Sequence, residues 1–140
     1  VCTRAAHYFS SPLYPEYEQV IRAHPEAYQA GSSFPDWGYS FDYPEASEEA
    51  HWPPFLEATA RYLRDRCPRP WDEEDERRIA FFLGVISHDI ADIDWHGLDG
   101  VREGFIDVMS RQEFHGDWGA AHDAADSGGD FVEIYQGDMN

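Results

Sequence analysis

The stretch Arg77–His96 (RRIAFFLGVISHDIADIDWH) begins as an apolar run and ends in two histidines and several aspartates. Residues 79 to 86 are apolar at every position except Gly84, which predicts a buried helix. His88, Asp92 and His96 then follow at intervals of four, so a helix stacks their side chains on one face. Burying imidazoles and carboxylates beside an apolar helix is costly without a cation. Neutral imidazole and ionised carboxylate are ligands for a metal such as zinc, so this stretch predicts a metal site.

Three other features extend this pattern. His122 and Asp126 are again four residues apart, His51 stands at the start of another predicted helix, and Asp36 lies in an aromatic-rich loop. One His-x-x-x-Asp pair is common by chance, and a single histidine near a helix end is usually a capping or hydrogen-bonded residue. Two such pairs and a further histidine, in a chain with only seven, favour a metal site. Helical bundles build such sites from inward side chains on facing helices, and these side chains could hold two zinc ions.

The remaining histidines and aspartates of these segments are interpreted as structural. His24 precedes Pro25 and connects two predicted helices. The other side chains are expected to support the core, cap helices, back the metal ligands or face solvent: His7, His115, Asp89, Asp94 and Asp123.

The spacing of apolar residues predicts an all-α fold, a bundle of five to seven helices. Proline in the first turn marks helix starts, glycine marks helix ends, and Asp72 is the expected cap of the central helix. No strand alternation, repeat or low-complexity tract is present. The expected helices are the remainder of one at 1–8, then 15–23, 25–30 stopped by Gly31, 51–66, the central helix, 101–110, and one in the second half of 114–126 stopped by Gly128-Gly129; 31–44 is expected to be a loop.

Composition narrows the possible partners. The 140 residues, 42% apolar, predict a single domain, residues 1–140. The formal net charge of −18 argues against nucleic-acid wrapping and against electrostatic docking on anionic lipid. Two cysteines are too few for a disulfide scaffold. No apolar run reaches transmembrane length. Val1 opens no signal peptide and is not an initiator methionine, so the chain is expected to be a processed or incomplete piece.

Four segments in order resemble a known family: AHPEAYQAGSSFPD (23–36), HWPPF (51–55), FFLGVISHDIADIDWHGL (81–98) and EFHGDWGAAHDAADSGGD (113–130). They are similar to the catalytic domains of glycosylphosphatidylinositol-specific phospholipases D, within the zinc-dependent phospholipase C superfamily. The superfamily also contains bacterial trinuclear-zinc phospholipases C and, more distantly, P1-type nucleases. The resemblance covers residues from about Arg22 to Asp130 and implies the all-α fold of this superfamily, with up to three zinc ions in a cleft.

The resemblance also implies roles for individual residues. Asp36 matches an acidic residue that is a zinc ligand or the general base, and Asp92 matches one that also bridges to a third zinc. Asp126 stands where bacterial members have glutamate, and the Asp92–His96 spacing is shorter than theirs. The implied ligand sets are His51, His88 and Asp92 for a first zinc, and His96, His122 and Asp126 for a second.

The chain departs from the family pattern at its ends. Family members ligate the third zinc with the mature N-terminal residue and a nearby histidine, whereas this sequence begins at Val1 in what reads as the middle of a helix. It also stops at Asn140, before the family's C-terminal helices and the propeller-like domain of the animal enzymes. The sequence is therefore expected to be a partial domain with two or three Zn²⁺ in the complete form.

The implied function is zinc-dependent hydrolysis of glycosylphosphatidylinositol anchors, giving phosphatidic acid and an inositol glycan. Expected partners are anchored proteins or phospholipid, without nucleic acid, and the oligomeric state is left open. The resemblance also implies a secreted, extracellular protein. Two alternatives remain open: a zinc-dependent phospholipase C or P1-type single-strand nuclease, and an inactive metal-binding fragment of a larger secreted protein.

Overall fold

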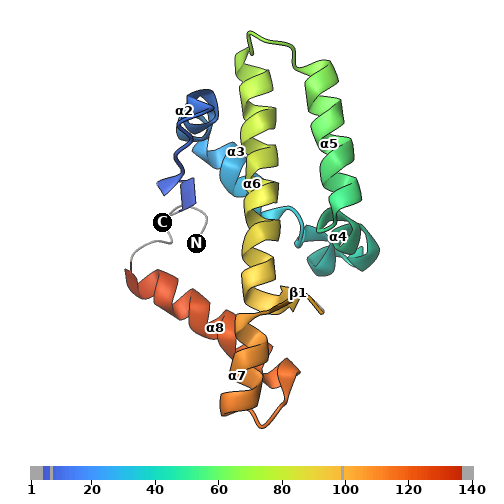
Figure 1. The fold of residues 1–140 in the computed structure, drawn as a ribbon, viewed down its shortest axis with the longest axis vertical. Helices are drawn as coiled ribbons and strands as arrows, with labels where there is room; N and C mark the ends of the chain where they lie inside the picture. Colours follow the sequence, from blue (N-terminus) through green and yellow to red (C-terminus); the bar gives the residue numbers. More distant parts are fainter. Residues whose placement is uncertain (1–4, 7, 99, 137–140) are drawn as a thin grey trace. The chain divides into compact units, whose positions relative to one another are not determined.

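A computed structural model describes residues 5–6, 8–98 and 100–136. It confirms the all-α prediction: the described residues form seven α-helices, one short 3-10 helix and a two-stranded hairpin. Most of the helix expected at 1–8, with His7, lies outside the described residues. The elements are α2 (Pro15–Ala23), α3 (Pro25–Ser33), η1 (Trp37–Phe41), α4 (Pro44–Ala50), α5 (Pro53–Arg66), α6 (Glu73–His96), β1 (Gly97–Leu98), β2 (Arg102–Glu103), α7 (Phe105–Glu113) and α8 (Trp118–Gln136) (Figure 1).

Proline sets the start of four helices. Pro15, Pro25, Pro44 and Pro53 each occupy the first turn of a helix, where the missing amide proton costs nothing and the fixed φ fits. The long helix α6 starts differently, because the Asp72 carboxylate accepts a hydrogen bond of 2.9 Å from the Asp75 amide. These starts agree with the sequence signals, apart from α4, which lies between the loop expected at 31–44 and the helix expected at 51–66 and was not predicted.

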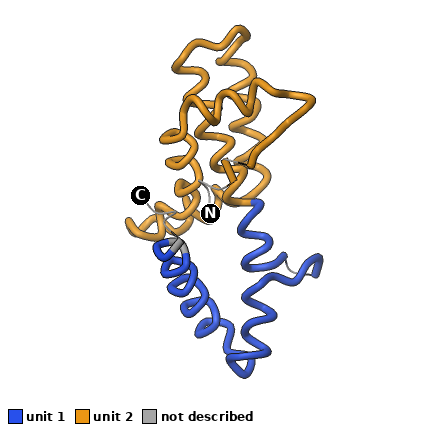
Figure 2. The backbone as a smooth tube through the Cα atoms, turned by 90° about the vertical axis from the view of Figure 1, so that its left-hand side faces the viewer, with its two compact units in different colours: residues 1, 90–140 blue, residues 2–89 orange. Residues whose placement is uncertain are grey.

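The chain divides into two compact units, residues 2–89 and residues 90–140 (Figure 2). In the first unit, α2 and α6 contribute the buried residues Val20, Ile79 and Ala80, around which partly buried side chains pack. In Figure 1, α5 runs antiparallel to the first part of α6 and is joined to it by the segment at 67–72. No residue of α5 is buried, and its apolar residues Ala60 and Leu63 line a groove together with side chains of α6 rather than a closed core.

Two glycines let the backbones of α3 and α6 touch. A Cβ atom at Gly31 would collide with the backbone of Phe81, and one at Gly84 would collide with the backbone oxygen of Tyr28. Only glycine permits this approach. The helix α3 therefore continues through Gly31 to Ser33, and the prediction that Gly31 ends it was wrong.

The second unit packs α7 against α8. Ile106, Ala121 and Ala125 form its buried core, and Trp95, Met109 and Phe114 cover them. Between α6 and α7, β1 and β2 pair antiparallel, with Gly97 opposite Glu103. A hydrogen bond of 3.0 Å from the Gly104 amide to the Asp107 carboxylate fixes the start of α7. The hairpin displaces this start to Phe105 from the expected position at Val101, which is exposed.

Two further expectations were wrong. Gly128-Gly129 does not end α8, which continues to Gln136, because a mid-helix glycine costs only about 1 kcal/mol and the residues that follow keep helical character. Residues 31–44 are not a plain loop, since they include the end of α3 and the 3-10 helix η1. Among the described residues, the helices lack the combination of length and apolar character that a membrane span requires.

Candidate metal centre

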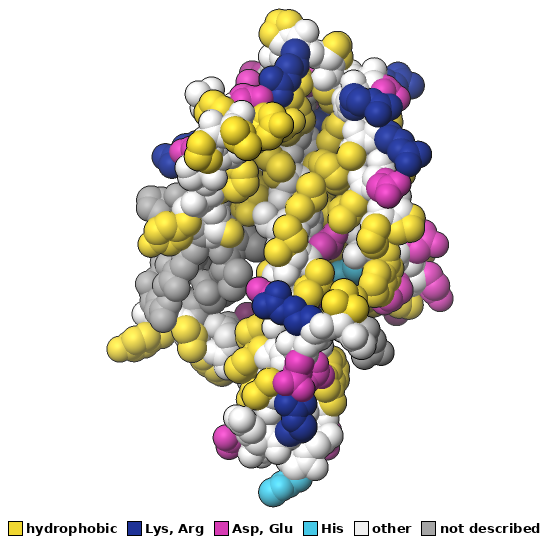
Figure 3. Space-filling model, viewed as in Figure 1, with side chains coloured by type: hydrophobic (Ala, Val, Ile, Leu, Met, Phe, Trp, Pro, Cys, Tyr) yellow, Lys and Arg dark blue, Asp and Glu magenta, His cyan; other side chains and the backbone are white. Residues whose placement is uncertain are grey.

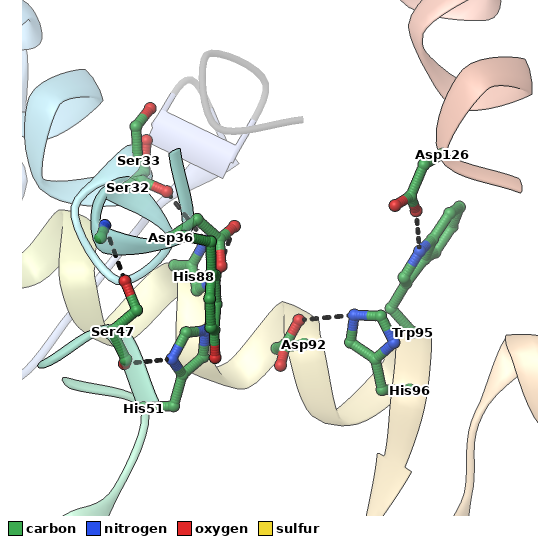
Figure 4. A network of polar contacts seen from close by, with 12 residues as sticks. Ser32, Ser33, Asp36, Ser47, His51, His88, Asp92, Trp95, His96 and Asp126 are labelled. Atoms are coloured by element: carbon green, nitrogen blue, oxygen red, sulfur yellow. Dashed lines mark hydrogen bonds and ion pairs between the residues drawn. The ribbon is translucent and has the colours of Figure 1, made fainter. Parts of the chain in front are cut away.

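Asp36, His51 and His88 converge in the first unit (Figure 4). Their potential ligand atoms all lie within 4.8 Å of one another, the one such group of three or more within the described part of the chain. Asp36 immediately precedes η1, His51 follows the last residue of α4, and His88 lies on α6. Three separate elements thus bring one carboxylate and two imidazoles together, as a metal site requires.

Backbone carbonyls fix the orientation of both imidazoles. His51 Nδ1 lies 2.8 Å from the carbonyl oxygen of Ser47, and His88 Nδ1 lies 2.9 Å from that of Ser32. A carbonyl oxygen can only accept, so each Nδ1 must carry the proton. In a neutral ring this leaves Nε2 with an exposed lone pair, and this support of a ligating histidine is usual in metal sites.

The two Nε2 atoms then face each other. His51 Nε2 and His88 Nε2 are 3.2 Å apart, and neither neutral ring has a proton left to place between them. Two lone pairs held this close repel unless a cation lies beside them. The Asp36 carboxylate points the same way, 3.3 Å from His51 Nε2 and 3.6 Å from His88 Nε2. These donors fit a divalent metal such as zinc.

The site is enclosed on the histidine side and open on the aspartate side. The imidazoles are 14% and 15% exposed, whereas the Asp36 carboxylate is 57% exposed. Two nitrogens and one oxygen would leave a tetrahedral ion a fourth position for water or substrate, the usual form of a catalytic zinc site. The arrangement can therefore bind a metal and still admit a ligand from solvent.

The second unit holds the other predicted ligands as two ion pairs. His96 Nε2 lies 3.1 Å from the Asp92 carboxylate, and His122 Nδ1 lies 3.5 Å from that of Asp126. The imidazoles of His96 and His122 stack with centroids 4.8 Å apart. These four predicted ligands therefore lie as neighbouring pairs, and Asp92, which the resemblance assigns to the first zinc, contacts His96.

Two tryptophans support this second cluster. The Trp95 indole donates a hydrogen bond of 2.9 Å to the Asp126 carboxylate (Figure 4). The Trp118 ring stacks on His122 at 5.0 Å, and its indole donates to the Asp107 carboxylate at 3.0 Å. The carboxylate of Asp126 and the ring of His122 are therefore each held by an aromatic neighbour.

Among the described residues, the histidines and aspartates that were interpreted as structural lie outside the group formed by Asp36, His51 and His88. His24 pairs with Glu76 at 3.0 Å, and Asp94 pairs with Arg102 at 2.7 Å. Asp89 is buried, whereas Asp123 is almost fully exposed. His115 is exposed in the turn before α8, where its backbone has a φ of 54°.

Sequence reasoning missed the groups that orient the imidazoles. The acceptors at Ser32 and Ser47 are backbone carbonyls, which every residue carries, so no residue type could reveal them. Trp118 offered a signal, since it precedes His122 by four residues and thus shares its helix face.

One buried thiol lies outside both clusters. Cys67, at the end of α5, is 5% exposed, and burial raises the pKa of its thiol, with the neighbouring Asp75 carboxylate acting in the same direction. Asp75 is itself paired with Arg78 at 3.2 Å. A thiol with a raised pKa is a poor nucleophile and a poor metal ligand, so Cys67 is best described as a structural cysteine.

Comparison with known proteins identifies relatives over the whole chain. The zinc-dependent phospholipase C family matches residues 3–138. The phosphatidylinositol-glycan-specific phospholipase D of Dictyostelium discoideum is 40% identical over 141 residues, covering 100% of this chain. The enzymes of that name from Bos taurus and Homo sapiens are 40% and 39% identical over 129 residues, or 89% of this chain. This chain spans 15% of the length of each of these relatives. No solved structure matches it.

Proposed function

The chain belongs to the zinc-dependent phospholipase C family, and we propose from this that it carries the zinc-binding part of a phosphodiesterase acting on glycosylphosphatidylinositol anchors. The observation that carries the proposal is the convergence of His51 Nε2, His88 Nε2 and the Asp36 carboxylate. The choice of substrate is supported by the shared name of the relatives at about 40% identity. The chain is proposed to be part of one such domain, in a secreted protein.

In the proposed reaction, water hydrolyses the phosphodiester that joins diacylglycerol to the inositol of the glycan. The water oxygen forms a bond to phosphorus, the bond from phosphorus to the inositol oxygen breaks, and the inositol oxygen takes up a proton. Bound zinc supplies Lewis acidity toward the phosphate and toward water. The products are phosphatidic acid and an inositol glycan still attached to its protein.

The residues of the first unit are proposed to have distinct roles. His51 and His88 present their Nε2 lone pairs as ligands, because the carbonyls of Ser47 and Ser32 hold the Nδ1 protons. Asp36 is the exposed member, so its carboxylate is placed to orient water or to accept its proton, in addition to binding metal.

In the second unit, His96, Asp92, His122 and Asp126 are proposed as ligands of further zinc, giving two to three ions in the complete domain. Imidazoles at stacking distance with a carboxylate beside each are suitable donors once the rings are neutral. The Trp95 indole holds the Asp126 carboxylate in a fixed orientation, a form of support common around metal ligands.

Product analysis tests the proposal. A radiolabelled anchor incubated with the zinc-loaded protein should release phosphatidic acid, and the His88→Ala variant should release none. Diacylglycerol instead would indicate a phospholipase C, the alternative that the family name favours, and 5′-nucleotides from single-stranded DNA would indicate a nuclease. None of these three products from either substrate, with zinc bound, would leave a metal-binding module without this activity.

A separate variant distinguishes the two proposed roles of Asp36, general base and metal ligand. Asp36→Asn keeps the size and one oxygen of the side chain but cannot accept a proton as a carboxylate does. If Asp36 is the general base, Asp36→Asn loses turnover and keeps its zinc; if it is mainly a ligand, zinc is lost together with turnover. Zinc stoichiometry by mass spectrometry, measured beside product release, separates the two roles.

A further inference from the structure

Exposed aromatic side chains lie beside the candidate metal centre of the first unit. Phe41 and Tyr43 are 65% and 60% exposed, although residues of this type are normally at least half covered. We call the set the aromatic rim; its members, all partly or largely exposed, are Trp37, Tyr39, Phe41, Tyr43 and Trp52. On the face seen in Figure 3, hydrophobic side chains gather over α4 with acidic side chains beside them.

The aromatic rim is an ordered structure rather than scattered side chains. Trp37 contacts Phe41 and Tyr43 at ring-centroid distances of 6.2 and 6.0 Å, and is anchored at 6.2 Å to Phe34. Phe34 in turn packs against Phe81 of α6 at 5.3 Å. The exposed rings are therefore attached to the interior of the unit through one half-buried phenylalanine.

A single carboxylate holds the other two rings. Glu48 accepts a hydrogen bond of 3.1 Å from the Tyr39 hydroxyl and one of 2.9 Å from the Trp52 indole. Both polar handles are thus satisfied within the protein, while the ring faces remain accessible. Aromatic side chains with one apolar body and one satisfied polar end are the type found where protein meets a membrane–water interface.

The aromatic rim adjoins the candidate ligands. Trp37 follows Asp36 directly in sequence, and the Tyr39 ring lies 6.2 Å from the imidazole of His51. A surface bound by the aromatic rim would therefore lie next to the open, aspartate side of the metal centre.

The charge of the chain around the aromatic rim limits the type of membrane that it can bind. The chain has no lysine, and no arginine occurs between Arg22 and Arg61, whereas seven carboxylates lie between them. A surface rich in anionic lipid would be repelled, since such membranes attract basic segments. A zwitterionic surface carries no net charge to oppose these carboxylates and still offers apolar and interfacial contact.

We propose that the aromatic rim is a lipid-docking surface that binds zwitterionic membranes of the phosphatidylcholine type and brings the metal centre to lipid phosphates. The role of docking in bringing the metal centre to its substrate rests on the proposed function, whereas membrane binding itself requires no turnover. Phe41 and Tyr43, the most exposed members, insert among the headgroups, and Trp37 supports them from behind.

Flotation with phosphatidylcholine vesicles tests the proposal on the zinc-loaded chain. The paired variant Phe41→Ser/Tyr43→Ser should lower vesicle partitioning by about tenfold or more, because it removes the two largest contacts with the lipid. The matched control is Tyr62→Ser, which removes an aromatic ring that is 56% exposed on α5 of the same unit and outside the aromatic rim. It should bind vesicles as the unchanged chain does. Circular dichroism and zinc content show that each variant is folded.

Four outcomes would overturn the proposal. These are no flotation of the unchanged chain, equal loss in Tyr62→Ser, tighter binding to vesicles enriched in phosphatidylserine, and a dimer in sedimentation that the paired variant dissociates. The last would mean that the aromatic rim binds a second copy of the chain. Because flotation is measured without hydrolysis, vesicle binding with no product release would refute the proposed reaction and leave the docking surface intact.

Discussion

The Nε2 atoms of His51 and His88 lie 3.2 Å apart, while each ring donates a hydrogen bond from Nδ1 to a backbone carbonyl oxygen. The protein thereby fixes the direction of two lone pairs through main-chain atoms of α3 and α4. Preorganised ligands lose little conformational freedom when an ion binds, which favours tight binding.

Removing either imidazole should weaken zinc binding without unfolding the chain. We expect His51→Ala and His88→Ala to lower zinc affinity at the first-unit site by at least about a hundredfold, because a ligand is lost outright. Competition with a chromophoric chelator measures this. His24→Ala is the matched control, since His24 lies in the same unit and pairs with Glu76 instead. Equal losses in all three variants would show that the effect is structural.

The Trp95 indole should matter for the second cluster. Trp95→Phe keeps an aromatic ring in the core beside α7 but removes the donor to the Asp126 carboxylate. Loss of such support typically lowers metal affinity by about tenfold. The matching control is Trp52→Phe, which removes an indole hydrogen bond to the exposed Glu48. Zinc affinity unchanged in Trp95→Phe would mean that Asp126 needs no support from this donor.

The contact of α3 with α6 should make Gly84 irreplaceable. In Gly84→Ala the added methyl group collides with the backbone oxygen of Tyr28, so we expect a loss of about 1–3 kcal/mol in the free energy of unfolding. The helices must separate, which also moves the Ser32 carbonyl away from His88 and weakens zinc binding.

Gly128→Ala provides the contrast for Gly84→Ala. Gly128 lies within α8 and a Cβ atom there would meet nothing within 4 Å, so alanine should stabilise by up to about 1 kcal/mol. Urea unfolding of both variants measures the change in the free energy of unfolding, which should be a loss for Gly84→Ala and a gain for Gly128→Ala. A neutral Gly84→Ala variant would show that α3 can shift without cost.

Cys67 should be protected from alkylation in the folded protein. Burial raises the pKa of its thiol, so the folded chain keeps the thiol proton at a pH where the unfolded chain begins to lose it. Stability from this group is present below the unfolded pKa, about 8.5, and is lost as the pH rises beyond it. Iodoacetamide at pH 8 should modify Cys67 at least about tenfold more slowly without urea than with it, by peptide mass spectrometry.

The sequence predicted the helices well where local chemistry sets their ends. Pro15, Pro25, Pro53 and Asp72 start helices by mechanisms that act within a few residues, and the apolar run of α6 identified the buried helix. It failed at Gly31, whose role depends on Phe81, fifty residues away. Pro44 followed by glutamates and alanines did carry a start signal for α4, which the aromatic residues around it obscured.

For the candidate site, the spacing of His and Asp residues in the sequence indicated which side chains are candidate ligands. It did not indicate which of them lie together in space. The four-residue intervals placed His88 and Asp92 on one face of α6, yet the carboxylate that joins His51 and His88 is Asp36, from a different segment. Grouping depends on where η1, α4 and α6 meet, which is a tertiary property. Whether Asp92 also serves the first zinc, as the resemblance implies, stays a prediction.

The carbonyl that orients His88 belongs to the main chain of Ser32, and its position depends on the glycine contact between α3 and α6. Evolution could therefore replace the side chain at position 32 with another of similar size and leave the acceptor in place, while even the smallest change at Gly31 or Gly84 would displace it. The orientation of the His88 imidazole therefore depends on the identity of Gly31 and Gly84, neither of which is a predicted metal ligand. A search for determinants of activity confined to ligands and their side-chain neighbours would overlook them.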